Sequence, residues 1–245
     1  MFYRNFRRGV FVLGTGMRMK KKLSVLFAIL TYSFVFANTY KGDVQGTTIT
    51  RIPVWVFLET MPGATSEYAK ASLPPRKAIT ELSCYLLSGL VFGSDFSYTP
   101  YDKTRNVPEF FEVTEKYRIS PDDQALEIKE LVPSYPYLYC LAEYTASDVL
   151  AKRQESWKTL SYKTVKGYGV GERSDEIQGV YDAYHNAIKD AVRRYAQTLT
   201  KNKPAEVSGQ FMIKGEPRLY MKSGRFHASL ELYIIIDTIR PYTQF

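Results

Sequence analysis

The 245-residue chain carries 33 Lys and Arg against 25 Asp and Glu, a formal net charge of +8 that would suit an acidic partner such as nucleic acid. Seven of those bases and none of the acids fall within residues 1–37, which leaves 26 bases and 25 acids in the rest. The basic surplus therefore belongs to the start of the chain, and the composition argues against a nucleic-acid-binding protein.

The first 37 residues have the three parts of a secretory signal peptide. A basic stretch at 18–22 is followed by an uncharged, mostly apolar run of 14 residues at 23–36. Ala37 completes the small-residue pattern that signal peptidase reads, which predicts cleavage between Ala37 and Asn38. An uncleaved membrane anchor is the alternative, but a spanning helix needs about 20 apolar residues, so this run is short for one.

Two further features of this region bear on export. Met17 and Met19 suggest that the natural start lies there and that residues 1–16 are an extension. No cysteine lies near the predicted cleavage point, so lipid attachment has no acceptor there. We therefore expect a periplasmic or secreted protein without a transmembrane segment after cleavage.

Residues 38–245 are enough for one large or two small domains, and they contain both cysteines of the chain, Cys84 and Cys140. Export makes a disulfide between them chemically permissible. The alternative is a pair of buried thiols, because free cysteine is among the most buried residue types. Sequence spacing does not decide between the two, since a bridge requires α-carbons within about 7 Å of each other.

Residues 38–150 contain one predicted helix among several predicted strands. The segment 51–59 favours a strand, and two prolines at its start favour a helix over 74–87. Further strands are expected at 98–104, 110–119 and 137–145.

Residues 151–245 contain the clearest predicted element. Apolar residues recur every three or four positions from Ile177 to Leu199, which predicts a helix over 175–201 that Pro204 ends. Strands are expected at 162–169, 206–214, 217–222 and 226–237, the last from alternation of apolar and polar side chains.

The two halves share one plan, which sets the predicted fold class. We expect an α+β fold of two β-α-β-β(-β) subdomains, with antiparallel-rich sheets that each carry one packed helix, and a boundary at 147–160. Residues 38–150 carry 10 bases and 15 acids, and residues 151–245 carry 16 bases and 10 acids. These opposite net charges would favour docking of one half on the other, or head-to-tail assembly.

A glycine motif, Gly167-Tyr168-Gly169-Val170-Gly171-Glu172, lies between a predicted strand and the long helix. A dinucleotide-binding loop needs G-x-G-x-x-G, and here the third glycine comes one residue early. Glu172 stands where that glycine belongs, and its carboxylate would repel a pyrophosphate. We therefore interpret the glycines structurally, as a strand exit with special backbone angles or a bulge, and expect no cofactor.

Signatures of metal binding and of nucleophilic catalysis are weak. The two histidines, His185 in the long helix and His227 on the last strand, lie in no H-E-x-x-H or C-x-x-C context. An enzyme that used Cys84 or His185 would need both in one cleft, with a perturbed cysteine pKa. We predict a non-catalytic protein without a metal site.

The chain is rich in aromatic residues, with 20 tyrosines and 14 phenylalanines. Tyr135, Tyr137, Tyr139 and Tyr144 form a cluster that alternates with proline and apolar residues. Half-buried strand positions are the ordinary interpretation of such a cluster. A protein interface is the second interpretation, because tyrosine combines apolar area with a polar tip, and stacking on a glycan is the third.

The second half resembles a known family. The run Val165-Lys166-Gly167-Tyr168-Gly169, followed by a helix with alanines at 183, 187, 191 and 196, is similar to the domain shared by small secreted bacterial lipoproteins and flagellar assembly protein T. The resemblance covers about residues 160–237. It implies an envelope protein with an assembly role, with the flagellar motor as one setting, and it carries over no catalytic residues. The family's lipid-bearing cysteine is missing here, so outer-membrane anchoring is not implied.

These observations lead to a functional expectation. We expect an exported envelope scaffolding or assembly protein that acts through contacts with envelope or flagellar-motor proteins, or with itself. The alternative is a periplasmic module that binds a small ligand or a glycan in an aromatic-lined pocket with a few polar groups.

Overall fold

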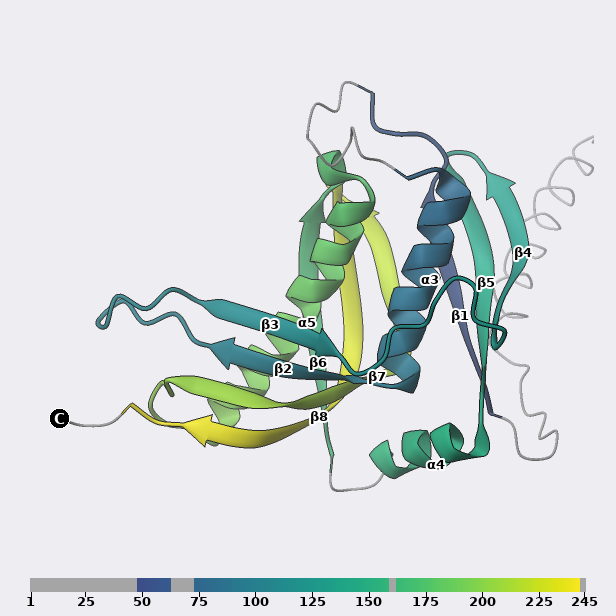
Figure 1. The fold of residues 1–245 in the computed structure, drawn as a ribbon. Coiled ribbons are helices and arrows are strands. Elements are labelled where there is room, and N and C mark those ends of the chain that lie inside the picture. Colours follow the sequence, from purple (N-terminus) through teal and green to yellow (C-terminus); the bar gives the residue numbers. More distant parts are fainter. Residues whose placement is uncertain (1–47, 63–72, 159–161, 243–245) are drawn as a thin grey trace, which may run out of the picture. The chain divides into compact units, whose positions relative to one another are not determined.

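The computed structural model describes residues 48–62, 73–158 and 162–242 of the chain (Figure 1). All of them belong to one compact unit that spans Gln45–Phe245. The predicted signal peptide and its cleavage point at Ala37 and Asn38 lie outside the described residues. The described residues form an α+β fold with two antiparallel sheets, as the sequence predicts.

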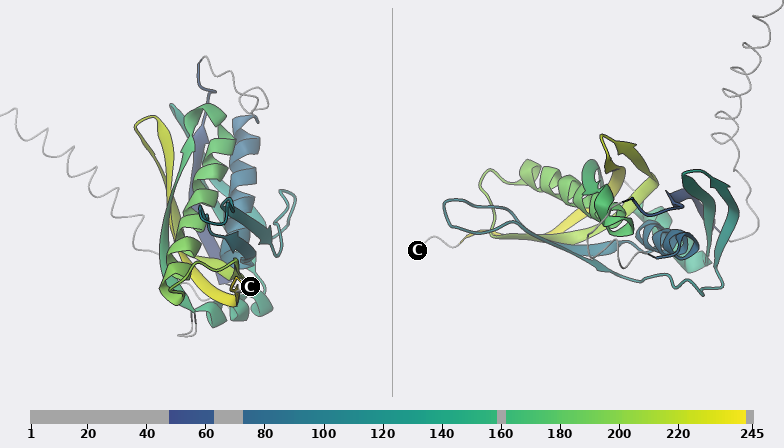
Figure 2. Two further views of the ribbon diagram at one scale, coloured as in Figure 1. Left: turned by 90° about the vertical axis from the view of Figure 1, so that its left-hand side faces the viewer. Right: turned by 90° about the horizontal axis from the view of Figure 1, so that it is seen from above.

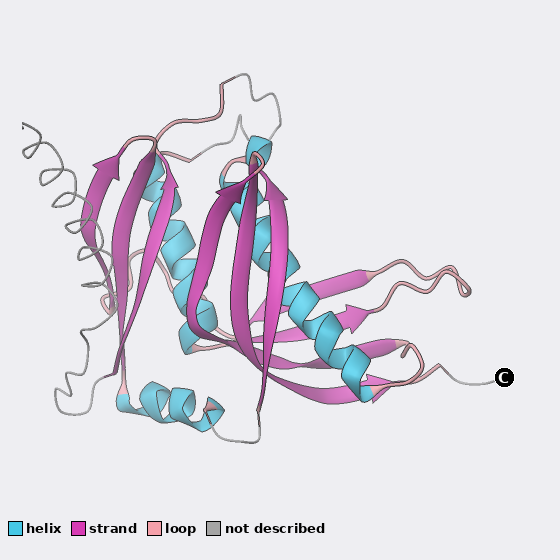
Figure 3. Ribbon diagram, turned by 180° about the vertical axis from the view of Figure 1, so that it is seen from behind, coloured by secondary structure: helices cyan, strands magenta, loops and turns pink. Residues whose placement is uncertain are grey.

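The first sheet, called sheet A here, has three antiparallel strands in the order β1-β5-β4. They are β1 (Thr48–Phe57), β4 (Leu126–Ser134) and β5 (Tyr137–Ala146). Helix α3 (Pro75–Val91) covers one face of it, and Figure 3 shows the three strands in front of this helix. Alternation in β1 buries Ile52, Val54 and Val56 in the core that includes α3 and turns the residues between them to the opposite face.

The second sheet, called sheet B here, has five antiparallel strands in the order β3-β2-β7-β8-β6. They are β2 (Ser94–Thr99), β3 (Phe110–Glu115), β6 (Lys163–Glu172), β7 (Glu206–Lys222) and β8 (Arg225–Arg240). Helix α5 (Ile177–Leu199) packs on this sheet through its buried stripe. The two helices lie side by side in Figure 2 and touch through the rings of Tyr85 and Tyr181, whose centroids are 5.2 Å apart.

Both sheets are built on one topology. In sheet A the last strand of the first half, β5, lies between β1 and β4; in sheet B the last strand of the chain, β8, lies between β6 and β7. Apart from the hairpin of β2 and β3, each half therefore contains a strand, a helix and two more antiparallel strands, with the final strand between the other two. The repeat that element order predicts is present in the arrangement of the strands.

The predicted boundary at 147–160 is wrong as a boundary between sheets. The hairpin of β2 and β3 precedes it in the chain, yet β2 pairs with β7 of the second half. Helix α4 (Asp148–Trp157) occupies the predicted linker instead. The hairpin also carries acids such as Asp95 and Glu112 into sheet B, so the opposite charges of the two halves do not separate with the sheets.

The glycine motif has a structural role, but the expected reason for it is wrong. Gly167, Gly169 and Gly171 hold regular ladder positions between β6 and β8, without a bulge, and none has a positive φ. Their α-carbons face the backbone of α5, where no side chain fits. A Cβ at these positions would lie 2.0, 2.1 and 1.8 Å from the carbonyl oxygens of Ala187, Ala183 and Gly179, respectively. The glycines allow a close approach of helix and strand.

Candidate functional site

A row of aromatic rings crosses the face of sheet A that is turned away from α3. The register of β1 and β5 places Trp55 opposite Tyr139 and Phe57 opposite Tyr137. The Tyr137 ring lies 4.9 Å from both Trp55 and Phe57 and 5.8 Å from Tyr139, measured between centroids. We call these four residues the aromatic ladder. Edge-to-face contacts at such distances stabilise aromatic clusters beyond their apolar area alone.

The exposure of the ladder increases toward β5 and the turn before it. Tyr139 is 40 % exposed, and Tyr135, in the turn between β4 and β5, is 77 % exposed. Val132, which is opposite Tyr139 on β4, is also exposed. The ladder thus continues into an apolar and aromatic surface that water covers in the isolated protein.

The other end of the ladder is fixed against sheet B. The Trp55 indole N–H donates a hydrogen bond of 3.3 Å to the carbonyl oxygen of Leu219 in β7. The Phe226 ring of β8 lies 6.4 Å from Trp55 and 6.0 Å from Phe57. These contacts hold the rings of β1 in place, so the exposed rings of β5 rest on a rigid base.

A buried ion pair supports the same region. The Arg173 guanidinium donates to Glu176 Oε2 at 2.6 Å and to the Glu59 carbonyl at 3.3 Å, and its Cζ lies 3.8 Å from the centroid of the Phe57 ring. Glu176 Oε1 accepts the Met61 N–H at 2.6 Å. The side chains of Arg173 and Glu176 are only 10 % and 7 % exposed, so each charge is compensated by the other in a site that is largely shielded from water.

Glu176 is also the N-cap residue of α5, directly before the first helical residue, Ile177. Its φ of +54° lies in the left-handed region, which a non-glycine residue adopts at a cost of about 1–3 kcal/mol. The contacts of its carboxylate offset that cost. The arrangement therefore ties the segment after β1 to the first turn of α5 and positions Phe57.

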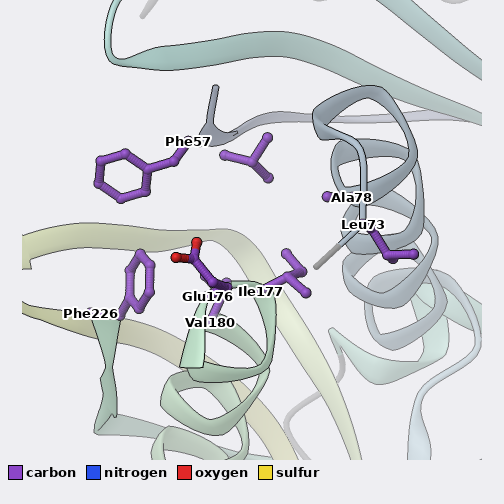
Figure 4. A pocket seen from close by; sticks show the side chains of 8 residues that line it. Phe57, Leu73, Ala78, Glu176, Ile177, Val180 and Phe226 are labelled. Carbon is purple, nitrogen blue, oxygen red and sulfur yellow. The ribbon is translucent and has the colours of Figure 1, made fainter. Parts of the chain in front are cut away.

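The hollow beside this ion pair is too small for an organic ligand. It lies among Phe57, Glu176, Val180 and Phe226 (Figure 4), and its volume is about 30 Å³. That volume is close to the share of one water molecule in the liquid. This position therefore has a structural role.

Two larger hollows lie elsewhere. The first, about 370 Å³, is bordered by the beginning of β1, by α4 and by the middle of β7, with Tyr233 as the one aromatic residue among the described residues of its lining. Gln154 lines it, and the Oε1 atom of that side chain is buried without a hydrogen-bond partner. The second, about 320 Å³, contains His185 with Glu172, Asp175 and Asp182.

The structure gives no support to a catalytic pair of Cys84 and His185. Cys84 is absent from the lining of the hollow that contains His185. Burial raises the pKa of the Cys84 thiol to about 11, which disfavours the nucleophilic thiolate. His185 packs on Phe111, and burial, followed by the charge of Lys189, lowers its pKa. Within the described ranges, no group of three or more His, Cys, Asp or Glu side chains could hold a metal ion.

The structure also places the other residues that the sequence singles out. Cys84 and Cys140 are both buried free thiols, and burial raises the pKa of Cys140 to about 11 as well. Tyr135 and Tyr139 are exposed and Tyr137 is half-buried, whereas Tyr144 points into the core and is 6 % exposed. Tyr144 therefore cannot belong to an exposed interface.

Some residues of the site were missed at the level of sequence. Trp55 and Phe57 fit an ordinary strand pattern, and nothing local distinguishes their face from the buried one. Arg173 and Glu176 look like solvated charges at a helix start, because the backbone groups that they contact, the Glu59 carbonyl and the Met61 N–H, are 114 and 115 residues away. The alternation Trp55-Val56-Phe57 was the one available signal, since it places two rings on the same face.

Comparison with known proteins shows a family. A protein-family model matches residues 39–242. A protein of Treponema pallidum (strain Nichols), which bears the name "Uncharacterized protein", is 36 % identical over 225 residues, which cover 89 % of this chain and 94 % of that protein. No solved structure matches the chain. In the described part of the chain, no helix is both long and apolar enough to cross a membrane.

Proposed function

The chain belongs to the same family as the Treponema pallidum protein, and from that premise we propose that it is an exported envelope protein that acts by binding other proteins. The observation that carries this proposal is the aromatic ladder with its exposed continuation at Tyr135 and Val132. We propose that the ladder is the docking surface for an envelope partner.

The chemistry of the ladder suits recognition. Tyrosine and tryptophan bury large apolar areas at little conformational cost, and their polar tips can find hydrogen bonds at an interface. Tyr137 and Tyr139 are held by ring contacts on one side and open to solvent on the other. A rigid aromatic base with an exposed rim resembles the central anchors that carry most of the energy in protein interfaces.

Export rests on the first 37 residues, with their basic stretch, apolar run and cleavage pattern at Ala37. The family match begins at residue 39, so the segment that we propose is removed lies outside the matched region. The proposed compartment is the periplasm or the exterior of the cell. A setting near the flagellar motor follows only from the resemblance of residues 160–237, and we propose it as one setting among those of the envelope.

The test is site-specific crosslinking in the cells that make the protein. A photoreactive amino acid at Tyr139 should yield a discrete adduct with an envelope protein. The matched control is the same amino acid at Tyr168, which is 50 % exposed on β6 and lies outside the ladder. Adducts at Tyr168 alone, or none at Tyr135 and Tyr139 in cells that contain the processed protein, would contradict the proposal.

A second candidate function is small-ligand binding in the hollow of about 370 Å³. The observation that favours it is the buried Gln154 Oε1 without a hydrogen-bond donor, which a ligand could supply. Native mass spectrometry of the protein purified from its own cells would show a bound small molecule. Loss of that molecule in Gln154→Ala, with the Tyr139 crosslink unchanged, would assign ligand binding to the hollow.

A further inference from the structure

In the described part of the chain the two sheets have four edge strands, β1 and β4 in sheet A and β3 and β6 in sheet B. Three of these edges are protected against pairing with another strand. Free edges invite pairing with other chains, so proteins usually protect them with prolines, bulges or covering side chains. On β6, Asp190 of α5 accepts the Tyr168 N–H at 3.2 Å, and Asn186 donates to the Val170 carbonyl at 2.9 Å. Side chains of α5 thus form hydrogen bonds with backbone groups of that edge, so these groups are not available to another strand.

The edges of sheet A are blocked by other means. The β4 edge contains Pro133, a register shift between Lys129 and Val132, and Glu130 with a φ of +51°. The β1 edge has Pro53 in its middle, where an N–H is missing. Neither edge offers a continuous row of donors and acceptors to an incoming strand.

The remaining edge, β3, is open. Its six residues include no proline, no positive φ and no register shift against β2. No hydrogen bond within the described ranges reaches the outward backbone groups of this strand. Figure 1 shows β3 as the last strand on its side of sheet B. The hairpin that contributes it is also the one insertion into the repeat, and it extends sheet B instead of the sheet of its own half.

The hydrogen-bond pattern shows which groups are available. The Lys116 N–H donates to the Gly93 carbonyl, directly beyond the pair formed by Ser94 and Glu115. Because hydrogen-bonded and non-bonded pairs alternate in an antiparallel ladder, the N–H groups of 110, 112 and 114 point toward β2. Those of Phe111, Val113 and Glu115 point out of the sheet.

The side chains of β3 select the kind of strand that would fit. Phe110 is 53 % exposed, and Glu112 and Thr114 are exposed on the same face. Glu109 and Glu115 have cationic neighbours in Lys189 and Arg118, but Glu112 has no ion-pair partner in the described part of the chain. In an antiparallel pair with β3 of a second copy centred on residue 112, the two Glu112 carboxylates would face each other and repel, whereas a basic residue opposite Glu112 would be attracted.

We propose that the β3 edge binds an extended segment of a partner protein by strand addition, and that this segment carries a basic residue between apolar ones. Backbone hydrogen bonds to 111, 113 and 115 supply the affinity. Phe110 and Glu112 supply the preference for an apolar and a basic side chain. This edge is separate from the aromatic ladder, so either site can fail in experiment without the other.

The test uses the full chain and a displayed library of random 12-residue peptides. We expect enrichment of peptides in which Lys or Arg alternates with Val, Ile, Thr or aromatic residues. Val113→Pro removes an outward N–H and spares the bonds to β2, so it should weaken binding at least tenfold. Glu112→Lys leaves the backbone donors and acceptors in place and should weaken binding of the same peptides. Glu112→Gln should weaken their binding less.

Amide exchange measured by NMR gives an independent readout. Bound peptide should slow exchange at 111, 113 and 115, while 110, 112 and 114 are protected already. The absence of enriched peptides would overturn the proposal. So would peptides that bind Val113→Pro and Glu112→Lys as well as the natural chain, provided that circular dichroism shows both variants folded. A dimer of the full chain that Val113→Pro dissociates would show that a second copy occupies the edge, which would also overturn it.

Discussion

At the scale of single residues, removal of one partner of the ion pair between Arg173 and Glu176 should lower the free energy of unfolding strongly. Glu176→Ala leaves a guanidinium that is 10 % exposed without its carboxylate, and removal of one partner of a buried pair typically costs about 3–5 kcal/mol. The measurement is the free energy of unfolding in urea. The control is Glu172→Ala, which breaks an exposed pair with Arg225 and should cost less than about 1 kcal/mol. Equal losses in the two variants would show that the buried pair has no special role.

The two thiols predict a loss of stability at alkaline pH. Burial raises the pKa of both Cys84 and Cys140 to about 11, from an ordinary value of 9.0. Between pH 9 and pH 11 the unfolded chain loses these protons while the folded chain keeps them. The unfolded state then binds fewer protons, so the free energy of unfolding falls as the pH rises.

The measurement is urea unfolding at pH 7.5, 9.5 and 10.5 for the natural chain and for a variant with Cys84→Ala and Cys140→Ala. The natural chain should lose more stability across this range than the variant, even if the variant is less stable at pH 7.5. Parallel pH dependence in both chains would argue against neutral buried thiols. Native protein without reactive thiols after unfolding in non-reducing buffer would instead indicate a disulfide.

At the scale of elements, the contact of β6 with α5 depends on the absence of side chains. In Gly169→Ala the new Cβ would lie 2.1 Å from the Ala183 carbonyl oxygen and 2.3 Å from the Ala187 nitrogen, which are backbone atoms and cannot rotate away. We expect a loss of about 3 kcal/mol or more in the free energy of unfolding. The control is Gly215→Asn, because Gly215 has open space and a φ of +66° that asparagine tolerates. A loss of less than 1 kcal/mol for Gly169→Ala would mean that the helix can move away.

The elements also show what a sequence can and cannot reveal. The pattern in β8 and α5 is predictable because each buries one continuous face, with a period of two or of about 3.6. β4 was missed because its bulge and Pro133 break the alternation, and α4 was missed because Trp157 is its one buried residue. The sheet to which β2 and β3 belong depends on a pairing with β7 that lies more than 90 residues away, and no local pattern encodes it.

The same distinction holds for the candidate site. Tyr135, Tyr137 and Tyr139 are predictable as a cluster because they are close in sequence. Their base in Trp55 and Phe57 is not, since it depends on the register between β1 and β5. Tyr144 is five residues beyond Tyr139, and in a strand with a period of two this odd offset turns it to the buried face.

At the scale of the whole molecule, the exchange of a hairpin between the halves makes them dependent on each other. β7 pairs with β2 of the first half on one side and with β8 on the other, and Ile213 packs against Gly89 of α3. A fragment of residues 151–245 lacks β2, β3 and α3. Buried side chains of β7 such as Val207 and Phe211 would then face water.

We therefore expect residues 151–245 to be unfolded or aggregated when produced alone, although they contain a complete β-α-β-β unit. Residues 38–245 should unfold in one cooperative transition, with coincident curves by circular dichroism and tryptophan fluorescence. Mixing of separately produced 38–150 and 151–245 should restore part of the native amide spectrum, because the missing strand pairings come from the other fragment. A well-dispersed amide spectrum from residues 151–245 alone would show that this half folds without the β2–β3 hairpin. The hairpin would then be an addition to an independently stable domain and would not be required for its core.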